Sequence, residues 1–448
     1  MKIDFEHLGG IEQGSVELND LTLFCGKNNS GKTYVMYSLY GLLDQKLPVN
    51  FDFIKEIVAK LEQDRNYQLD LTEIINHHQE EMLRHIEECF KKNLPHLFGV
   101  KDEDFISTKI KIHFPDDCIQ ERTKNKSYFI TQETPELRNG LQQLILRDRD
   151  NNVDIVMFLY EHELHKYLSQ KLTNIIFFDW QKAKYCFLLP AERAGINLCI
   201  KELFSVRNLL LQEAQNNNAD PMLLLKDVLA ARYAEPVKDY MQFLNNIGGN
   251  KRIGNYSEYA QTIEKNILGG KYEVDDFGNV SFLPNESKNK LPLHFSSSTV
   301  KTLFGLVFYL EHLAKPGDYL MIDEPELNLH PDNQRQVVRV LAQLVNAGLK
   351  VIVSTHSDYF VRELNNLLML NNKFVGSAEL QKKYGYQDNE LLDSKKVSAY
   401  LFDKKTITPM VLDDEGIIAD TFDEVINALN QSSNKIYFAM QDAKEAGD

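Results

Sequence analysis

The chain has 448 residues, of which 43% are hydrophobic and 26% are charged, which is typical of a folded globular protein and excludes a disordered chain. No apolar stretch approaches the ~20 residues that cross a bilayer, so we expect no membrane partner. The formal net charge of −15 argues against a surface that coats nucleic acid over its whole extent. It leaves a local DNA-binding track open and suits a basic partner protein.

The five cysteines are scattered along the sequence, and none of them forms a CxxC pair. This spacing favours reduced thiols over a disulfide framework or a zinc site. We therefore expect a cytoplasmic location.

The first elements predict the setting of a phosphate-binding loop. Apolar residues alternate with period two from Ile3 to Leu18, which indicates a β-hairpin. A short apolar strand at 21–25 then runs straight into a glycine-rich segment. Apolar residues at helical spacing follow from 33 to 43. Strand, loop and helix in this order form the context that a P-loop requires.

The glycine-rich segment matches the complete P-loop pattern. Its glycines allow backbone N–H groups to wrap phosphates, its lysine reaches the β- and γ-phosphate oxygens, and its threonine hydroxyl ligates Mg²⁺. We therefore expect ATP and Mg²⁺ as cofactors. The predicted nucleotide-binding residues are Gly26, Lys27, Asn28, Asn29, Ser30, Gly31, Lys32 and Thr33, and Thr33 is also a predicted metal ligand.

The sequence then changes character over residues 46–184. Apolar spacing predicts amphipathic helices near 54–61 and 74–86. Segments 110–114 and 128–130 look like antiparallel strands joined by an exposed turn. No sustained heptads occur here, so we expect an inserted mixed β/helical lobe and not a long coiled-coil arm.

A buried strand is predicted at 185–189 and is followed by Arg193. Three roles stay open for this arginine: contact with a phosphate, a bridge to a partner subunit, or an exposed salt bridge. Residues 201–269 are predicted to form a helical subdomain, and 272–282 a hairpin.

A serine-rich segment at 295–301 begins the next predicted helix. Serine hydroxyls and the free amides of a helix N-terminus can bind a phosphate, and the same residues can serve as an ordinary N-cap. Both readings stay open. The predicted phosphate contacts in this segment are Ser296, Ser297 and Ser298.

An apolar strand at 319–322 ends in two adjacent carboxylates. We expect Asp323 to hold Mg²⁺ through water and Glu324 to polarise the attacking water as the general base. An apolar strand followed by Asp-Glu is also a common structural pattern. Its place behind a complete P-loop favours the metal-and-base interpretation.

A further apolar strand at 351–355 ends at His356. The interval after Asp323 leaves room for one crossover helix, so this histidine is expected on the neighbouring strand, where it senses the γ-phosphate. A hydrogen-bonded surface histidine is the alternative. From residue 295 onward the alternation of helices and strands predicts a parallel sheet.

The motifs Asp-Glu-Pro-Glu-x-Asn-Leu-His-Pro, which begins at Asp323, and Ser-Thr-His-Ser around His356 resemble the ABC-type ATPases. That group includes the SMC, RecF and OLD-like (overcoming lysogenisation defect) proteins. The resemblance covers about residues 1–45 and 185–365. It implies that Asp323 and Glu324 form the Walker B pair and that His356 is the switch histidine.

The same resemblance implies that residues 326–331 form the D-loop. It also implies that 295–301 is the signature segment that completes the site of the opposite protomer, although the usual glycines are missing. Many OLD-like proteins carry a Toprim nuclease with an Asp-x-Asp pair. No such pair follows His356, so we expect no nuclease here.

The predicted fold is therefore α/β, a P-loop ABC-type ATPase head with a mixed sheet, an inserted β/helical lobe and a helical subdomain. The head is assigned to residues 1–45, 185–200 and 270–448, the lobe to 46–184, and the helical subdomain to 201–269.

The resemblance further implies a slow ATPase that acts as a nucleotide-controlled switch or scaffold. Its partners would be a second copy, in an ATP-sandwich dimer or higher homo-oligomer, and a separate effector such as a nuclease. In this it resembles anti-phage defence ATPases such as those of PARIS and Septu. Two alternatives stay open: a RecF-like ATPase that clamps DNA in repair or maintenance, and a nucleotide-dependent scaffold with negligible turnover.

Overall fold

A computed structural model provides the structure of the chain. It describes residues 1–44, 49–115, 119–120, 123–124, 126–133, 141–147, 153–178, 185–199, 233–249, 252–275, 278–413, 415–418 and 420–445.

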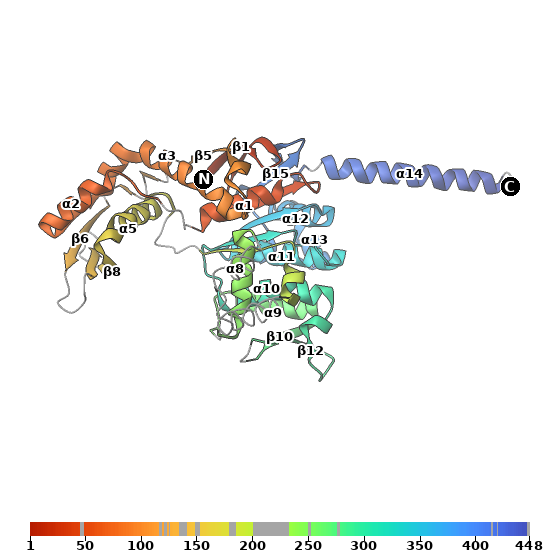
Figure 1. Cartoon of the computed structure of the whole chain (residues 1–448). Coiled ribbons are helices and arrows are strands. Elements are labelled where there is room, and N and C mark those ends of the chain that lie inside the picture. Colours follow the sequence, from red (N-terminus) through yellow and green to blue (C-terminus); the bar gives the residue numbers. More distant parts are fainter. Residues whose placement is uncertain are drawn as a thin grey trace, which may run out of the picture.

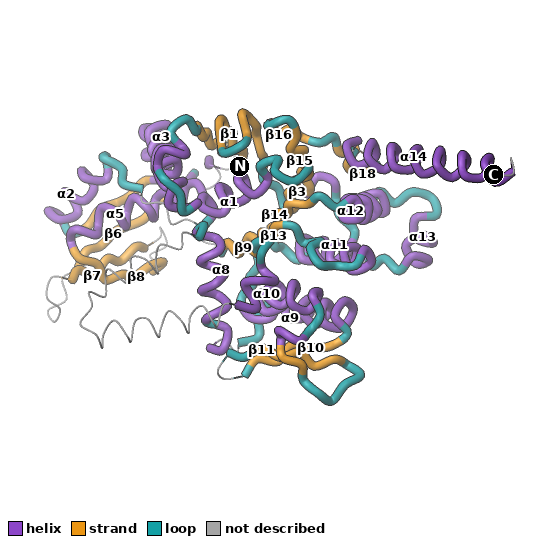
Figure 2. Tube along the Cα trace, turned by 45° about the vertical axis from the view of Figure 1, so that its right-hand side comes forward, coloured by secondary structure: helices purple, strands orange, loops and turns teal. Residues whose placement is uncertain are grey.

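A nine-stranded mixed sheet forms the centre of the molecule, in the order β5-β1-β2-β16-β15-β3-β14-β13-β9 (Figure 2). The neighbouring strands from β15 to β9 pair in parallel, whereas the pairs β15–β16, β2–β1 and β1–β5 are antiparallel. The prediction of a mixed α/β sheet is confirmed. The strands are β1 (Lys2–Leu8), β2 (Ile11–Glu17), β3 (Leu21–Gly26), β5 (Lys109–His113), β9 (Cys186–Leu189), β13 (Tyr319–Asp323), β14 (Lys350–Thr355), β15 (Val397–Asp403) and β16 (Thr406–Pro409).

Helices cover both faces of this sheet, which is why its central strands are apolar throughout. In β3 the side chains of Leu21 and Leu23 lie in one core with α10, α11 and α12, whereas Phe24 lies in the other with α1 and α3. The period-two alternation of a strand sends successive residues into opposite layers. These helices are α1 (Lys32–Leu43), α3 (Leu71–Phe98), α10 (Ser298–His312), α11 (Pro331–Asn346) and α12 (Asp358–Asn371).

A second, four-stranded antiparallel sheet in the order β4-β6-β7-β8 lies to one side with α2 and α5 (Figure 1). The strands predicted at 110–114 and 128–130 both exist, as β5 and β6, but they do not pair with each other. Strand β5 pairs with β1, where Ile110 lies opposite Phe5, and the apolar faces of both strands then enter one core. The elements of this region are α2 (Ile54–Asp64), β4 (Asn66–Asp70), η1 (Asp102–Phe105), β6 (Ser127–Glu133), β7 (Leu141–Arg147), β8 (Val153–Tyr160), α5 (Glu161–Thr173) and η2 (Asn174–Phe178).

Part of the predicted helical subdomain, residues 201–232, lies outside the described residues. The remainder contains α8 and α9, and the hairpin predicted at 272–282 is confirmed as β10 and β11. The predicted domain boundaries stay a prediction. The elements are α8 (Glu235–Asn245), η3 (Ile247–Gly249), α9 (Ser257–Ile263), η4 (Glu264–Leu268), β10 (Gly270–Val274), β11 (Val280–Pro284), β12 (Leu291–Pro292) and η5 (Leu293–Phe295).

The last part of the chain completes the sheet with β15 and β16 and ends in a long helix that projects from the body (Figures 1 and 2). None of the helices within the described ranges combines the length and apolar character that a bilayer crossing demands. The remaining elements are α13 (Ser377–Tyr384), η6 (Asp388–Glu390), η7 (Ser394–Lys396), β17 (Leu412–Asp413), β18 (Gly416–Ile417) and α14 (Asp420–Glu445).

Candidate nucleotide-binding site

The predicted site residues gather at the carboxyl ends of the parallel strands. The P-loop follows β3, Asp323 ends β13, His356 follows β14, and Arg193 follows β9. Strand β14 lies between β3 and β13, so the predicted crossover through α11 is confirmed. In open α/β sheets this edge is where ligands bind.

Two positions of the P-loop require glycine. Gly26 has φ 149°, and a Cβ there would lie 2.5 Å from the carbonyl oxygen of Phe402. Gly31 has φ 98°, and its Cβ would lie 2.7 Å from Ile11. Any side chain would therefore strain the loop or push it away from its neighbours. Because α1 begins at the next residue, the loop presents a helix N-terminus, where backbone amides favour anions.

The P-loop lysine folds back over its own loop. The Nζ of Lys32 donates to the carbonyl oxygens of Gly26 and Lys27, at 2.9 Å each, and the residue is 5% exposed. Burial lowers the pKa of this ammonium, while the nearby carboxylates of Glu324 and Asp323 oppose that shift. A phosphate oxygen is a stronger acceptor than a carbonyl for such a cation.

The hydroxyl of Ser30 is buried and has no hydrogen-bond partner among the described residues. A buried hydroxyl without a partner carries a free-energy cost that a bound acceptor relieves. Asn29 beside it has φ 60°, a left-handed conformation that asparagine tolerates better than most residues. The loop therefore fits a phosphate group.

Asp323 connects β13 to the P-loop helix. Its Oδ2 accepts a hydrogen bond of 3.0 Å from the hydroxyl of Thr33, its Oδ1 accepts one from the hydroxyl of Ser354, and it is 2% exposed. Hydroxyl and carboxylate oxygens suit Mg²⁺, which usually takes one or two protein oxygens together with substrate phosphates. The predicted metal pair is thus brought together, and Ser354 is a member of the cluster that the sequence did not predict.

Glu324 is held in an unusual backbone conformation with φ 49°. Its N–H donates to the carbonyl oxygen of Ser354 at 3.1 Å. Burial is the main cause that raises the pKa of its carboxyl, with the charge of Asp323 adding to the rise and that of His356 opposing it. Left-handed non-glycine residues cost on the order of 1 kcal/mol or more and cluster at functional sites.

His356 lies between two carboxylates. Its Nδ1 is 3.6 Å from Oε1 of Glu324 and 3.4 Å from Oε1 of Glu326. Glu326 also accepts hydrogen bonds of 2.8 Å from the hydroxyl of Thr355 and from the backbone N–H of His356. Its other oxygen is buried and unpaired within the described part of the chain. Glu326 was predicted only as part of the D-loop, and the structure identifies it as the residue that fixes His356.

Arg193 is 2% exposed and lies beneath the Walker B turn. Its guanidinium donates to three carbonyl oxygens, those of Asp323 at 2.7 Å, Glu324 at 2.8 Å and Pro190 at 3.0 Å. Burial lowers its pKa. The expectation of an exposed salt bridge was wrong because the side chain is buried, whereas a contact with a phosphate or a partner subunit stays a prediction. The planar fork instead satisfies the carbonyls where β9 and β13 end.

The serine segment lies at the N-terminus of α10. Ser297 is the N-cap and accepts a hydrogen bond of 3.3 Å from the N–H of Val300, so the N-cap interpretation is confirmed. The hydroxyl of Ser296 donates to the carbonyl oxygen of Pro292, and Ser297 and Ser298 are exposed. Among the described residues no hydrogen bond joins these serines to the P-loop of the same chain. Their phosphate-binding role stays a prediction.

The serine segment also contacts the D-loop. The hydroxyl of Thr299 donates to the carbonyl oxygen of Asn328 at 3.3 Å, and the amide of Asn328 reaches the hydroxyl of Thr302 at 3.4 Å. The serine segment, which the resemblance assigns to the site of the opposite protomer, is therefore adjacent to the predicted D-loop.

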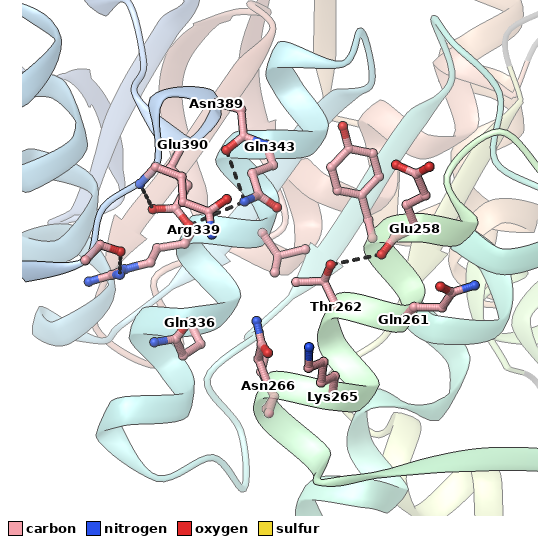
Figure 3. A pocket seen from close by; sticks show the side chains of 15 residues that line it. Glu258, Gln261, Thr262, Lys265, Asn266, Gln336, Arg339, Gln343, Asn389 and Glu390 are labelled. Carbon is pink, nitrogen blue, oxygen red and sulfur yellow. Dashed lines mark hydrogen bonds between the residues drawn. The ribbon is translucent and has the colours of Figure 1, made fainter. Parts of the chain in front are cut away.

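A separate polar cavity of about 720 Å³ lies between α9, α11 and the loop before β15 (Figure 3). Gln343 points into the cavity, and its side-chain Nε2 lies 3.4 Å from Oδ1 of Asn389 and 3.4 Å from Oε1 of Glu390. The guanidinium of Arg339 at its wall is bound to Glu363 at 2.6 Å. None of the predicted nucleotide-site residues lines this cavity.

A family profile described as AAA ATPase domain matches residues 1–361. Among curated proteins, the chain is 23% identical over 175 residues to the energy-coupling factor transporter ATP-binding protein EcfA2 of Mycoplasma mobile, with 36% of this chain and 55% of that protein covered. It is 32% identical over 82 residues to EcfA1 of Thermotoga maritima, with 18% and 32% covered. It is 31% identical over 70 residues to the cell division ATP-binding protein FtsE of Streptococcus pneumoniae, with 15% and 30% covered.

The matches thus span between about a third and somewhat over half of each curated relative. Among solved structures, the SMC head domain from Thermotoga maritima aligns with a TM-score of 0.30 at 10% identity, covering 92% of this chain and 98% of that one. An SMC head bound to the C-terminal winged-helix domain of ScpA aligns with a TM-score of 0.33 at 10% identity, covering 91% and 96%.

Proposed function

This chain belongs to the AAA ATPase domain family, and we propose that it is an ATP-driven switch whose hydrolysis site is completed by a second copy. The observation that supports this best is the 3.0 Å hydrogen bond between Thr33 and Asp323. It brings the start of the P-loop helix and the end of the Walker B strand to one point. A metal-bound nucleotide requires that arrangement.

In this proposal the P-loop amides and the Ser30 hydroxyl receive the phosphates of ATP. Lys32 exchanges its two carbonyl contacts for phosphate oxygens. Thr33 and Asp323 would hold Mg²⁺, which neutralises charge on the phosphates when it is bound. The buried position of Lys32 and Asp323 strengthens their electrostatic effect because little water screens them.

Glu324 is proposed as the general base. Its raised pKa makes it a better proton acceptor for the attacking water, and the Arg193 contact to its carbonyl fixes the backbone that carries it. His356 is held by Glu326 within reach of the same space and is proposed to sense the γ-phosphate. Hydrolysis would then change the contacts of His356 and of the loop that begins at Glu326.

The exposed serines and the adjacent Asn328 support a two-copy arrangement. Ser297 and Ser298 are exposed at the N-terminus of α10, where a phosphate would be favoured. We propose that they face the γ-phosphate bound by the P-loop of a second copy. ATP would then join two copies, and hydrolysis would release that interface.

We propose further that this switch controls a separate effector, with a nuclease as the first candidate, in anti-phage defence. The motif resemblance to OLD-like ATPases supports this role, and the net charge of −15 suits a basic partner protein better than direct DNA coating. The RecF-like alternative predicts that the isolated chain binds DNA with a steep dependence on salt.

The first experiment measures ATP binding and ATP turnover of Glu324→Gln beside Glu379→Gln, a control on the exposed helix α13. We expect Glu324→Gln to bind ATP and to lose at least about 100-fold in turnover, as general-base catalysis contributes. Glu379→Gln should match the natural chain. Normal turnover in Glu324→Gln would refute the assigned base.

The second experiment tests the defence role in a host that carries the chain with its neighbouring genes. Phage plaque counts should rise when Lys32→Ala replaces the natural chain, and the effector should co-purify with the natural chain. Unchanged protection with Lys32→Ala would contradict the switch.

A further inference from the structure

Gln334 lies in the first turn of helix α11, directly after the predicted D-loop at 326–331. Its Nε2 donates to the carbonyl oxygen of Leu329 at 3.0 Å, and its Oε1 accepts a hydrogen bond of 2.6 Å from the hydroxyl of Ser357. Leu329 belongs to the D-loop, whereas Ser357 directly follows the predicted switch residue His356. One side chain therefore joins the D-loop to the loop that carries His356.

A second contact joins the same two segments through Thr355. Its hydroxyl donates to Oε1 of Glu326 at 2.8 Å and accepts a hydrogen bond of 3.0 Å from the backbone N–H of Ser357. Within the D-loop, the N–H of Leu329 donates to the carbonyl oxygen of Glu326 at 3.1 Å. These contacts form a closed ring of hydrogen bonds, and Gln334 is the member of the ring that lies outside both segments.

The packing of α11 against α12 does not depend on Gln334. The two helices lie side by side (Figures 1 and 2), and the buried carboxylate of Glu363 on α12 lies 2.8 Å from Nε of Arg335 and 2.6 Å from Nε of Arg339. Ser357 also remains the N-cap of α12 without Gln334, because its Oγ accepts a hydrogen bond of 3.3 Å from a backbone N–H of that helix. Gln334 thus fixes two loops at the ends of helices that other contacts hold together.

The D-loop side of the ring continues to the serine segment. Asn328, which precedes Leu329, has φ 60°, and its carbonyl oxygen accepts a hydrogen bond of 3.3 Å from the hydroxyl of Thr299. A displacement of Leu329 would therefore reach the N-terminus of α10, where we propose the contact with the ATP of a second copy.

We propose that Gln334 is a positioning residue that makes the D-loop follow the switch histidine. This coupling rests on the proposed function, in which the γ-phosphate fixes His356 and thereby the neighbouring Ser357. The carboxamide of Gln334 then passes the restraint to Leu329, because it offers an acceptor and a donor on one planar group. Hydrogen-bond networks with discrete arrangements can carry such coupling between sites.

The test measures backbone amide hydrogen exchange of the full chain in the D-loop segment 326–330 and in the switch segment 355–357. Ser298→Glu is the background, because its carboxylate repels the γ-phosphate bound by a second copy and so prevents that copy from covering the D-loop. The non-hydrolysable analogue AMP-PNP is compared with ADP, each with Mg²⁺. In this background AMP-PNP should slow exchange in both segments by about fivefold, the factor that one typical hydrogen bond contributes.

Gln334→Met removes both hydrogen bonds and keeps the length of the side chain. AMP-PNP should then still slow exchange in the switch segment, whereas the D-loop should exchange equally with AMP-PNP and with ADP. Gln334→Glu should give the same result, because it keeps an acceptor for Ser357 but lacks a donor for the carbonyl oxygen of Leu329.

The matched control is Gln336→Met. Gln336 is half-buried on the same helix, and its side chain forms no hydrogen bond among the described residues, so this variant should behave as the background does. Circular dichroism checks the fold of each variant, and Gln334→Glu decides the result should Gln334→Met fail to fold.

A D-loop that still responds to AMP-PNP in Gln334→Met or in Gln334→Glu would overturn the proposed coupling, and so would a response that Gln336→Met also abolishes. A background chain in which AMP-PNP slows exchange in the P-loop and the switch segment but not in the D-loop would overturn the coupling and leave the proposed function intact. If AMP-PNP leaves the switch segment unchanged, the proposed sensor role of His356 fails and the coupling fails with it.

Discussion

Replacement of Arg193 by methionine should destabilise the chain and slow ATP turnover together. The substitution keeps most of the side-chain volume but removes the donors to the carbonyl oxygens of Pro190, Asp323 and Glu324. A hydrogen bond from a charged donor contributes roughly 1.5–3 kcal/mol, and a buried acceptor left unpaired costs roughly 1–3 kcal/mol. Removal of the buried charge itself offsets part of this loss, because burial disfavours the guanidinium.

The net loss should therefore be about 3 kcal/mol, within the range of broken buried polar networks. Chemical denaturation followed by circular dichroism measures this loss of stability. ATP turnover reports whether Glu324 has moved from its position in the site. The stability and ATP turnover of Arg193→Lys should lie between those of Arg193→Met and those of the natural chain, since one ammonium cannot reach three carbonyls in the geometry of a planar fork. Arg362→Met removes an exposed pair with Asp358 and should cost under about 1 kcal/mol. An Arg193→Met chain as stable and active as Arg362→Met would refute this account of the turn.

Three further predictions test neighbouring parts of the account. Thr33→Val removes the hydroxyl bound to Asp323 and should lower ATP turnover at least about tenfold, or 1.4 kcal/mol, in a steady-state assay, with the fold retained; unchanged turnover would contradict the metal pair. Glu326→Ala should lower ATP turnover while ATP binding persists, because the backbone N–H of His356 loses its acceptor. Glu326→Gln should recover most of that turnover. Equal activity of the two variants would contradict the positioning role. Burial raises the pKa of Glu264 from 4.5 to about 7, so the folded chain binds this proton more tightly than the unfolded chain. The protonated carboxyl of Glu264 therefore contributes stability that is fully present below pH 4.5 and is lost as pH rises through 7. Denaturation at several pH values should show the natural chain losing stability relative to Glu264→Gln over that window, and parallel curves would contradict the shift.

The sequence predicted the parts of the site that depend on local order along the chain. Strand, glycine loop and helix at the P-loop, and apolar strands that end at Asp323 and His356, each follow from patterns within about ten residues. Parallel strands place their carboxyl ends at one edge, so the meeting of Thr33 with Asp323 followed from topology.

The parts that the sequence did not predict depend on contacts between distant segments. Arg193 satisfies carbonyls of a strand 130 residues away, and no local pattern distinguishes that role from a surface arginine. The alternation of β5 predicted a strand but not its neighbour, because period two gives the faces of a strand and not its pairing partner. Ser354 and Glu326 belong to the motifs around His356 and after Asp323, but the groups with which they form hydrogen bonds depend on the register of β13 against β14.

The central claim, that two copies share each ATP site, is tested most directly by complementation. Lys32→Ala and Ser298→Glu are each expected to be inactive, the first because it cannot hold ATP and the second because its carboxylate repels the γ-phosphate of the partner. The two variants are co-expressed with different tags, and complexes that carry both tags are purified and assayed for ATP turnover. In such a complex one of two sites is intact, so turnover should return to about half that of the natural dimer. Mixed complexes as inactive as either variant alone would contradict the shared site.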